Sequence, residues 1–446
     1  MARAKKEAAF TPEERLQAAL VPDWEWPYKL PENWCWTYLT KAAECLDSFR
    51  KPINATERAG RNGNVPYYGA TGQVGWIDDF LTDEDLVLLG EDGAPFLDLI
   101  KDKAYLISGK AWVNNHAHIL RSLFGDTGNR YLLHYLNSFN YAGYVNGTTR
   151  LKLTQASMDT IPIPLPPLAE QQRIVDRIES LFAKLDEAKE KAQAVADSFE
   201  TRKAAILHKA FTGELTAKWR EEHGVGMDSW EKKSVGELCI SLKYGTAKKS
   251  DASGNVVVLR MGNLQQGEID WSDLAYSNDP DDIERYKLFP GDVLFNRTNS
   301  AALVGKTAIY RGEHPAIYAG YLIKLDYDHD KIIGDYLNYA LNTLDAKKYC
   351  NSVKTDGVNQ SNINAKKIGA YSFNVPNIPE QEKIVSVIQK LLSKEQQSKA
   401  AAEAVLDQID LMKKSILARA FRGELGTNDP IEESALELLK RVLESK

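Results

Sequence analysis

The stretch of sequence that decides the fold occurs twice: PPLAEQQRIVDRIESLFAKL at residues 166–185 and PNIPEQEKIVSVIQKLLSKE at residues 376–395. The two copies belong to longer segments, 166–215 and 376–425, which align without a gap and share 21 identities in 50 positions. Chance would give roughly 3 identities, so we interpret the repeat, with its period of 210 residues, as an internal duplication.

Each copy has the spacing of a long coiled-coil helix. A proline-rich stretch at 161–167 leads into the first copy and is expected to be extended, because a residue before proline avoids the helical region. In the second copy, polar Glu395 and Ser398 interrupt the apolar seam, and they either fix the register or mark a loosely packed stretch. Both helices end in Phe-x-Gly-Glu-Leu, with Gly213 and Gly423 expected just beyond the last turn. In the first copy, intervals of four and three residues define a heptad seam made of Ile174, Ile178, Leu181, Leu185, Ala188, Ala192, Val195 and Phe199.

The segments before the two helices are rich in Gly, Asn, Tyr and Trp and in short β-branched runs, which is typical of compact α+β domains. We therefore predict an α+β protein with two globular α/β domains and two long antiparallel coiled-coil helices related by pseudo-two-fold symmetry. Forty helical residues span about 60 Å, which would hold the two domains apart. The predicted order is an N-terminal segment (1–30), a first domain (31–160), a first spacer helix (161–220), a second domain (221–370), a second spacer helix (371–426) and a C-terminal helical tail (427–446).

The N-terminal segment repeats a fragment of the first helix end, since Ala9-Phe10-Thr11 echoes Ala210-Phe211-Thr212. We expect residues 1–30 to complete the pseudo-symmetric join beside the end of the second helix. The basic residues at the N-terminus are not followed by an apolar core, so no signal peptide is predicted.

The composition excludes several protein classes. With 446 residues, 43% hydrophobic and 26% charged, the chain is neither collagen-like nor wholly disordered. No apolar run reaches the ~18 residues that a spanning helix needs. The four cysteines form no Cys-x-x-Cys pair and indicate a reduced, cytoplasmic setting. The net charge of −6 argues against binding nucleic acid through bulk charge.

Catalytic motifs are scarce. Gly305-Lys306-Thr307 resembles the end of a P-loop, but the required earlier glycine is replaced by Ser300, so a turn between strands is favoured. His116 and His118 lack a third metal ligand nearby in the sequence, and we expect surface or hydrogen-bonding roles for them. Acidic pairs such as Asp78 and Asp79 lie in loop-like stretches and are interpreted as solvated charge. No catalytic residue, cofactor site or metal site is predicted.

Loops rich in Arg, Asn, Gln and Thr are better suited to reading DNA, because Arg pairs with guanine, and Asn or Gln with adenine, in the major groove. The alternative is that Asn and Gly merely form turns. Residues 231–370 contain 18 basic and 18 acidic residues, so a partner would have to supply positive charge for tight binding. The candidates are Arg58, Arg61, Asn62, Tyr68, Lys110, Asn114, Thr149, Arg150 and Lys152 in the first domain, and Arg260, Asn263, Asn296, Arg297, Asn299, Lys306, Lys354, Thr355, Asn359, Gln360 and Asn362 in the second.

The whole pattern resembles the specificity subunit of type I restriction-modification systems. The resemblance rests on the two Pro-x-Leu/Ile-x-Glu-Gln-x-x-Ile-Val stretches (166–175 and 376–385), on Ala-Phe-x-Gly-Glu-Leu at 210–215 and 420–425, and on the stretches 291–299 and 356–364. It covers nearly the whole chain. The second copy departs from the first at Asn377, which aligns with Pro167 and affects only the local path of the chain.

The resemblance implies that the two domains are target-recognition domains and that the helices are spacers. Each domain would read one half of an asymmetric, bipartite DNA target, with the two half-sites about 34–36 Å apart if both domains read the same face of the duplex. Two modification subunits would dock on the spacer, bring S-adenosylmethionine and flip an adenine of each half-site for methylation. ATP-dependent and Mg²⁺-dependent restriction subunits would complete the assembly, and this chain itself would be non-catalytic and cytoplasmic.

Two other functions remain possible from the residues alone. A coiled-coil adaptor that binds only proteins would share the helices but would not need the polar loops. A self-contained nuclease or NTPase would have to be built around Gly305-Lys306-Thr307.

Overall fold

The computed structural model describes residues 11–358 and 360–444, which form two compact units. Unit 1 runs to Gln193 and resumes at Glu403, whereas unit 2 runs from Ala194 to Ala402. Each unit therefore combines one globular domain with one part of each long helix. No helix in the described part of the chain has the length and apolar character needed to cross a membrane.

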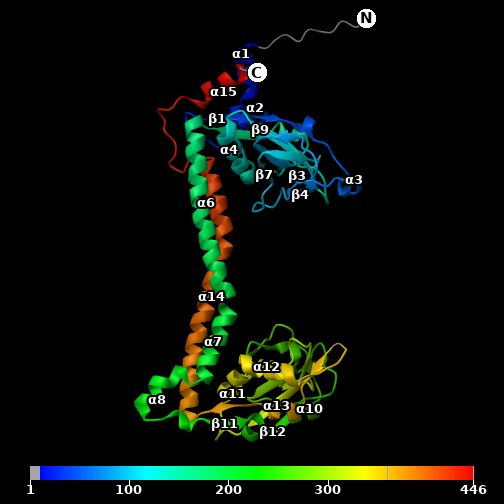
Figure 1. Ribbon diagram of the computed structural model, residues 1–446, viewed down its shortest axis with the longest axis vertical. Helices are drawn as coiled ribbons and strands as arrows, with labels where there is room; N and C mark the ends of the chain where they lie inside the picture. The colour runs from blue at the N-terminus through cyan, green and yellow to red at the C-terminus, as the bar shows by residue number, and fades with distance from the viewer. Residues whose placement is uncertain (1–10, 359, 445–446) are drawn as a thin grey trace. The chain divides into compact units, whose positions relative to one another are not determined.

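The two long helices pair in antiparallel fashion within each unit (Figure 1). The first is divided into α6 (Leu168–Asp197) and α7 (Phe199–Phe211), and the second is α14 (Ile378–Ala420). In unit 1, Ile174 near the start of α6 shares a core with Leu417 near the end of α14. In unit 2, Leu207 near the end of α7 shares a core with Ile384 near the start of α14. The predicted antiparallel arrangement is confirmed.

The first helix is interrupted at Ser198, where the sequence predicts a continuous helix. The Ser198 hydroxyl donates to the carbonyl of Ala194 at 2.6 Å and to that of Val195 at 3.2 Å, and such back-bonding competes with the helical hydrogen bonds. Val195, a predicted seam residue, is 36% exposed at this interruption. Its repeat equivalent, Val405, is 42% exposed, and Met412 is 46% exposed. The prediction of a buried side chain at Val195 is therefore wrong, whereas its seam neighbours Ala192 and Phe199 are buried.

The polar residue Glu395 in the second seam has a partner. Its carboxylate forms an ion pair with Arg202 of α7, and both side chains are about one quarter to one third exposed. Ser398, the other polar seam residue, is exposed, and its hydroxyl donates to the carbonyl of Lys394 at 3.0 Å. The Arg202–Glu395 pair is consistent with a role in fixing the register.

The first domain contains two four-stranded sheets. One is antiparallel, in the order β2-β9-β6-β7, and α4 packs on it. The other has the order β4-β3-β8-β5, and β3 and β8 are parallel. The elements are β1 (Cys35–Tyr38), α2 (Leu39–Ala42), β2 (Ala43–Cys45), α3 (Ala55–Ala59), β3 (Val65–Gly69), β4 (Gly72–Ile77), β5 (Thr82–Asp83), β6 (Leu86–Gly90), β7 (Ala104–Ile107), β8 (Lys110–Val113), β9 (Ala117–Ser122), α4 (Gly125–Ser138), α5 (Gln155–Met158) and β10 (Pro162–Leu165).

The second domain has an antiparallel sheet in the order β12-β21-β17-β19 and smaller sheets around it. A three-stranded sheet, β16-β13-β20, contains the parallel pair β13 and β20. The elements are α8 (Ala217–His223), β11 (Glu231–Ser234), α9 (Val235–Leu238), β12 (Cys239–Tyr244), β13 (Val256–Leu259), β14 (Leu264–Gln265), β15 (Glu268–Ile269), β16 (Tyr276–Ser277), α10 (Pro280–Tyr286), β17 (Val293–Asn296), β18 (Thr298–Asn299), β19 (Thr307–Ile309), β20 (Ala316–Tyr318), β21 (Leu322–Tyr327), α11 (Gly334–Leu341), α12 (Leu344–Val353), β22 (Thr355–Asp356), β23 (Ser361–Asn362), α13 (Ala365–Gly369) and β24 (Ser372–Val375).

The two domains share a sheet order that their sequences conceal. The sheet β2-β9-β6-β7 of the first domain corresponds to the sheet β12-β21-β17-β19 of the second. In both sheets the first strand in the sequence pairs with the last, and the second strand pairs with the last and the third. Each domain is also closed by an antiparallel pair between its first and last strands, β1 with β10 and β11 with β24. The last strand of each pair leads directly into a long helix, so each domain is fixed at the start of its spacer.

A buried glutamate joins each domain to its spacer helix. In unit 1, Glu170 is fully buried and accepts hydrogen bonds from the indole of Trp34 at 2.7 Å, the amide of Asn428 at 2.8 Å and the hydroxyl of Thr427 at 3.3 Å. Burial raises the pKa of Glu170 above its ordinary value, against the opposing effect of these donors and of Arg173.

In unit 2, Glu380 occupies the equivalent place in the repeat and is also fully buried. It accepts a hydrogen bond from the indole of Trp230 at 3.0 Å, as Glu170 does from Trp34. Here the other donors are the hydroxyl of Thr216 at 2.7 Å and the guanidinium of Arg220 at 2.6 Å. Glu380 is therefore neutralised by a cation, Arg220, whereas, among the described residues, Glu170 accepts hydrogen bonds from neutral side chains only.

The described part of the N-terminal segment lies against the end of α14. Val21 and Leu30 share a core with Leu417 and Phe421, and the Tyr28 hydroxyl donates to the carbonyl of Phe421 at 3.1 Å. The chain ends in α15 (Ala435–Glu444), which packs on α1 (Pro12–Ala19). Ala9 and Phe10 of the predicted echo lie outside the described residues. Gly213 and Gly423 have φ angles of 81° and 73°, which favour glycine at these helix ends.

Candidate nucleic-acid interface

In the first domain, two predicted arginines lie together on the sheet that contains β3 and β8. Arg58 lies 4.7 Å over the ring of Tyr67, and Arg61 lies 4.7 Å over the ring of Trp112. Tyr67 and Trp112 are opposite each other in the parallel pairing of β3 with β8, so the two guanidinium groups cover neighbouring rings. Arg61 also forms an ion pair with Asp78 at 2.6 Å, and its hydrogen bond lowers the pKa of Asp78.

Other predicted residues surround this sheet. Lys110 begins β8 and lies 4.5 Å over the ring of Phe80, while Asn62 is exposed in the loop after α3. The ring of Tyr68 packs 5.8 Å from that of Tyr105. Sequence reasoning missed Trp76, which is 55% exposed on the adjacent strand β4, because its exposure depends on the sheet pairing. Arg58 lies on the face of Tyr67 and Gly75, so Trp76, the next residue of β4, lies on the opposite face of the sheet.

The cations of the predicted loop at 149–152 pair with carboxylates of the same domain. Arg150 pairs with Asp92 at 2.9 Å, and Lys152 pairs with Glu91 at 3.0 Å, while Thr149 is exposed. Burial would raise the pKa of Glu91, but hydrogen bonds from Arg50 and Lys152 lower it below its ordinary value. Both cations of this loop are thus neutralised within the domain.

One cluster of possible metal ligands lies behind that loop. Ligand atoms of Asp47, Glu91 and His118 are within 4.8 Å of one another. However, the guanidinium of Arg50 pairs with both carboxylates, and the His118 ring nitrogens lie 2.6 Å from Asp47 and 2.9 Å from the carbonyl of Leu153. Arg50 therefore already supplies the positive charge that a metal ion would bring, and we assign the cluster a structural role.

In the second domain, a small sheet brings together two loops that the sequence predicted separately. Strand β23 pairs with β18 on one side and with β22 on the other. The amide of Asn362 donates to the hydroxyl of Thr298 at 2.8 Å, and the ammonium of Lys354 lies 3.4 Å from the carboxylate of Asp356. Residues Arg297, Asn299, Lys354, Thr355 and Asn362 of the predicted set lie on or beside this sheet, and Gln360 lies in the exposed turn between β22 and β23.

Arg297 and Arg260 line one cavity of about 630 Å³ beside this small sheet. The guanidinium of Arg297 lies 4.7 Å over the ring of Tyr244 and donates to the carbonyl of Gly320 at 3.2 Å. The Nε atoms of both arginines are buried and have no hydrogen-bond partner among the residues that the structure describes. Sequence reasoning missed Lys248 and Lys249, which line the same cavity. The pairings of β21 with β12 and β17, and of β13 with β20, bring these distant loops together.

Three predicted asparagines are buried and hold loops. Asn263 is 2% exposed, with bonds to the backbone of Arg260, Asp270 and Asp273. Asn296 is fully buried and bonds to the backbone of Met261 and Thr298. Asn114 is 8% exposed and accepts from the backbone of His116. These three side chains are buried within the domains, and their contact with DNA stays a prediction. Asn359 lies outside the described residues.

Lys306 lies in a different cavity from the arginines. Gly305 has a φ angle of 92° in a turn, and Thr307 begins strand β19, so a strand follows where a P-loop would require a helix. The turn between strands that the sequence favoured is therefore present.

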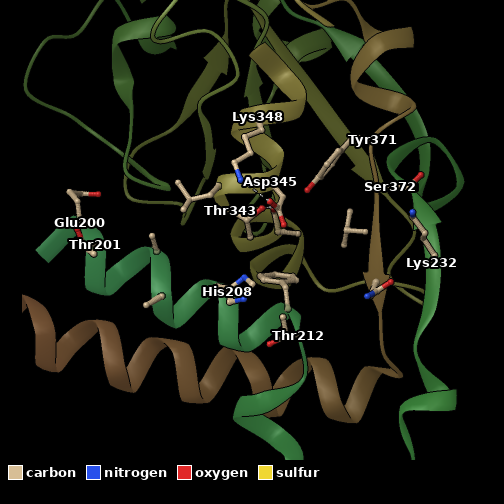
Figure 2. A pocket seen from close by; sticks show the side chains of 17 residues that line it. Glu200, Thr201, His208, Thr212, Lys232, Thr343, Asp345, Lys348, Tyr371 and Ser372 are labelled. Carbon is tan, nitrogen blue, oxygen red and sulfur yellow. Dashed lines mark hydrogen bonds and ion pairs between the residues drawn. The ribbon is translucent and has the colours of Figure 1, made fainter. Parts of the chain in front are cut away.

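A larger cavity, of about 870 Å³, lies where α7 meets the second domain. Figure 2 shows His208 of α7 and Thr212 just after that helix on one side, and Asp345 and Lys348 of α12 on another. Tyr371, just before β24, and Ser372, its first residue, also line the cavity. Burial raises the pKa of Tyr371, against a hydrogen bond with Thr343. Lys348 lies 3.8 Å from Asp345, so its charge is offset locally.

Comparison with protein families identifies the class of protein. The type I restriction modification DNA specificity domain matches residues 44–195 and 227–404, which is most of the chain. The chain therefore belongs to this family, in agreement with the resemblance of its repeats.

Individual relatives agree with this assignment. The chain is 28% identical over 303 residues to the Type I restriction enzyme StySPI specificity subunit of Salmonella potsdam, covering 66% of this chain and 65% of that subunit. It is 28% identical over 308 residues to the EcoKI specificity subunit of Escherichia coli K12, again covering 66% and 65%. The match thus spans slightly less than two thirds of either relative. A putative specificity subunit of Haemophilus influenzae, S.HindORF215P, is 27% identical over 366 residues, covering 79% of this chain and 86% of that protein.

Two solved structures share the fold. The HsdS subunit from Thermoanaerobacter tengcongensis aligns over 90% of this chain and 100% of its own, with a TM-score of 0.58 and 20% identity. A chain from a study of complex assembly and conformational transition in the type I R-M system aligns over the same shares, with a TM-score of 0.64 and 18% identity.

Proposed function

We propose that this chain is the DNA-reading subunit of a type I restriction-modification complex and that each globular domain reads one half of a bipartite, asymmetric target. The observation that carries the proposal is that two domains with the same sheet order present different polar side chains. In the first domain these are Arg58, Arg61 and Lys110 around an aromatic sheet, and in the second they are Arg260 and Arg297 around a cavity. One scaffold with two different surfaces suits the reading of two different half-sites.

The net charge supports a shared rather than an independent contact with DNA. The chain has a formal charge of −6, and much of the affinity for a duplex comes from phosphate neutralisation. In the first domain, Arg150 and Lys152 are already paired with carboxylates. We therefore propose that partner subunits supply most of the positive channel and that this chain supplies base selection.

The partners follow from the same proposal. Two modification subunits would dock on the spacer helices, bind S-adenosylmethionine and methylate an adenine in each half-site. Restriction subunits would bind ATP and Mg²⁺, translocate DNA and cut it. This chain would carry no catalytic residue, and the assembly would act on DNA in the cytoplasm.

Mapping of methylated adenines in the host genome tests the function directly. With the gene present, we expect one motif made of two short half-sites and a non-specific gap; without the gene, that motif should be unmethylated. An unchanged methylation map would contradict the proposal.

Substitution of Arg297 tests the second domain. We expect Arg297→Ala to lose about 1–3 kcal/mol of discrimination against the wrong base in one half-site, the usual value for a bidentate arginine contact. Competition binding with intact and altered half-sites measures this loss. Arg285→Ala is the matched control, because Arg285 is exposed on α10 and does not line the cavity. Intact assembly with unchanged discrimination in Arg297→Ala would favour a protein-binding adaptor.

A further inference from the structure

A third cavity, of about 480 Å³, lies within unit 2 where α7 meets the loop before β19 and the first turns of α12. Three lysines line it, each from a different element: Lys203 from α7, Lys306 from the loop, and Lys347 from α12. Among the described residues that line it, Glu200 is the only carboxylate, and it is exposed. The cavity is therefore basic in a domain that is neutral overall.

The three lysines have neutral partners or none that would offset their charge. The ammonium of Lys203 donates to the carbonyl of Gln266 at 3.1 Å, and that of Lys306 donates to the side-chain carbonyl of Gln265 at 2.8 Å. Within the described part of the chain, none of the three lysines forms an ion pair closer than 4.0 Å, and Lys347 is exposed on its helix. Three cations thus converge on one cavity without a bound carboxylate.

The electrostatics of the cavity favour an anion. Burial lowers the pKa of Lys306, and the charge of Lys347 lowers it further. Burial also lowers the pKa of Lys203. The charge of Lys347 adds to this shift, and the charges of Glu200 and Glu268 oppose it. Burial is thus the main reason that the charged forms of Lys203 and Lys306 are disfavoured, and an anion in the cavity would stabilise these charges.

The equivalent place in unit 1 has acidic residues near its lysines, although the Lys103 ammonium is buried without a hydrogen-bond partner among the described residues. Lys103 directly precedes β7 as Lys306 precedes β19, and Lys413 is the repeat equivalent of Lys203. In unit 1, Lys413 pairs with Asp186 at 2.6 Å, and Asp102 is close enough to Lys103 and Lys413 for them to lower its pKa against the larger effect of burial. The unit 2 loop, residues 297–306, contains no acidic residue.

We propose that the cavity lined by Lys203, Lys306 and Lys347 binds a phosphate group. A lysine ammonium is a compact point charge with three donors, and three of them from different elements can surround a tetrahedral anion. The phosphate comes either from the backbone of a DNA duplex, in which case the inference rests on the proposed function, or from a free phosphate compound. The side-chain amides of Gln265 and Asn351 provide further polar groups on the cavity wall.

Calorimetric titration of the purified full-length chain with inorganic phosphate tests the free-anion source. We expect Lys347→Gln to weaken binding about tenfold, the equivalent of one charge-assisted hydrogen bond. The matched control is Lys348→Gln, the next residue of α12, which lines the neighbouring cavity of Figure 2. Lys347 is exposed, so its substitution leaves the fold intact.

The salt dependence of duplex binding tests the DNA source. If a backbone phosphate occupies the cavity, Lys347→Gln should reduce the slope of log K against log salt by about 0.9, with the preference for the target sequence unchanged. A changed slope assigns the phosphate to DNA, and weakened inorganic phosphate binding with an unchanged slope assigns it to a free compound. The proposal is overturned if neither quantity changes, or if Lys348→Gln changes them equally.

These outcomes are separable from the fate of the proposed function. A chain with no preference for any sequence, alone or assembled, would refute DNA reading, while the phosphate titration would still report on the cavity. Conversely, normal target preference with no effect of Lys347→Gln in either assay would refute only the phosphate site.

Discussion

Each unit contains a buried glutamate at the junction between its domain and a long helix, but the two glutamates have different partners. In both, the segment that follows the end of one long helix packs against the start of the other, where it meets a fully buried glutamate and a tryptophan indole. In unit 2 that segment brings Arg220 to Glu380, whereas in unit 1 it brings Asn428 and Thr427 to Glu170. The comparison shows that the duplication preserved the buried carboxylate and its indole donor but not the means of compensating its charge.

The difference has an energetic meaning. Removing one partner of a buried ion pair is costly in stability, because the other partner stays charged and is shielded from water. A buried carboxylate surrounded by neutral donors can be replaced by an amide at a smaller cost, provided that the amide finds the same partners. Unit 2 should therefore be the more sensitive of the two to loss of its glutamate charge.

The largest effect is expected for Glu380→Gln. The substitution leaves the charge of Arg220 unpaired. Both carboxylate oxygens of Glu380 accept hydrogen bonds, so the NH2 group of the glutamine must face a donor, either Trp230 or Arg220. We expect a loss of about 3–5 kcal/mol in the stability of this junction. Hydrogen exchange of peptides covering residues 213–235 measures it, with unit 1 peptides as an internal control. A loss below about 1 kcal/mol would show that the ion pair contributes little.

A smaller effect is expected for Glu170→Gln, because the amide oxygen can accept from Trp34 and Asn428 while its nitrogen donates to Thr427. At neutral pH we expect a change of about 1 kcal/mol or less in the opening of peptides that cover residues 427–435. A loss as large as that of Glu380→Gln would remove the distinction between the two units.

The pH dependence of stability gives a further test of how Glu170 is accommodated in unit 1. Burial raises the pKa of Glu170, so the folded state binds its proton more tightly than the unfolded state, and its contribution to stability falls as pH rises from the ordinary pKa through the raised one. Glu170→Gln cannot titrate. Its stability deficit relative to the wild type should therefore be largest below the ordinary carboxyl pKa and should shrink above the raised one. Denaturant midpoints measured across this range check the sign, and a deficit that grows with pH would contradict it.

The helices could be predicted because their information is local. The alternating spacing of residues such as Ile174 and Ile178 indicates one buried face, and the repeat indicates that matching faces pair. The interruption at Ser198 could not be predicted, because it depends on whether a serine hydroxyl bonds to solvent or to the carbonyl of Ala194. The shared sheet order was hidden for a similar reason, since strand pairing depends on contacts between residues far apart in the sequence.

The candidate site was predictable in residue type but not in exposure. Asn263, Asn296 and Asn299 look alike in the sequence, yet the first two are buried and hold loops, and only Asn299 lies partly exposed on the small sheet. The cavity between Arg260 and Arg297 required the parallel pairing of β13 and β20, which no local pattern indicates. The absence of acidic residues in the loop before Lys306 was visible in the sequence, but its meaning depended on the nearby position of Lys203 and Lys347.

The central proposal is that the two domains are separate readers and that the helices between them set the distance between their half-sites. Deletion of one matched heptad from each helix, residues 186–192 and 407–413, tests it most directly, because the ion pairs Asp186–Lys413 and Lys189–Asp410 show that these segments face each other. The deletion shortens the spacer by about 10 Å. Mapping of methylated adenines should then show a shorter gap between the same two half-sites. Altered half-site bases with an unchanged gap would contradict the account.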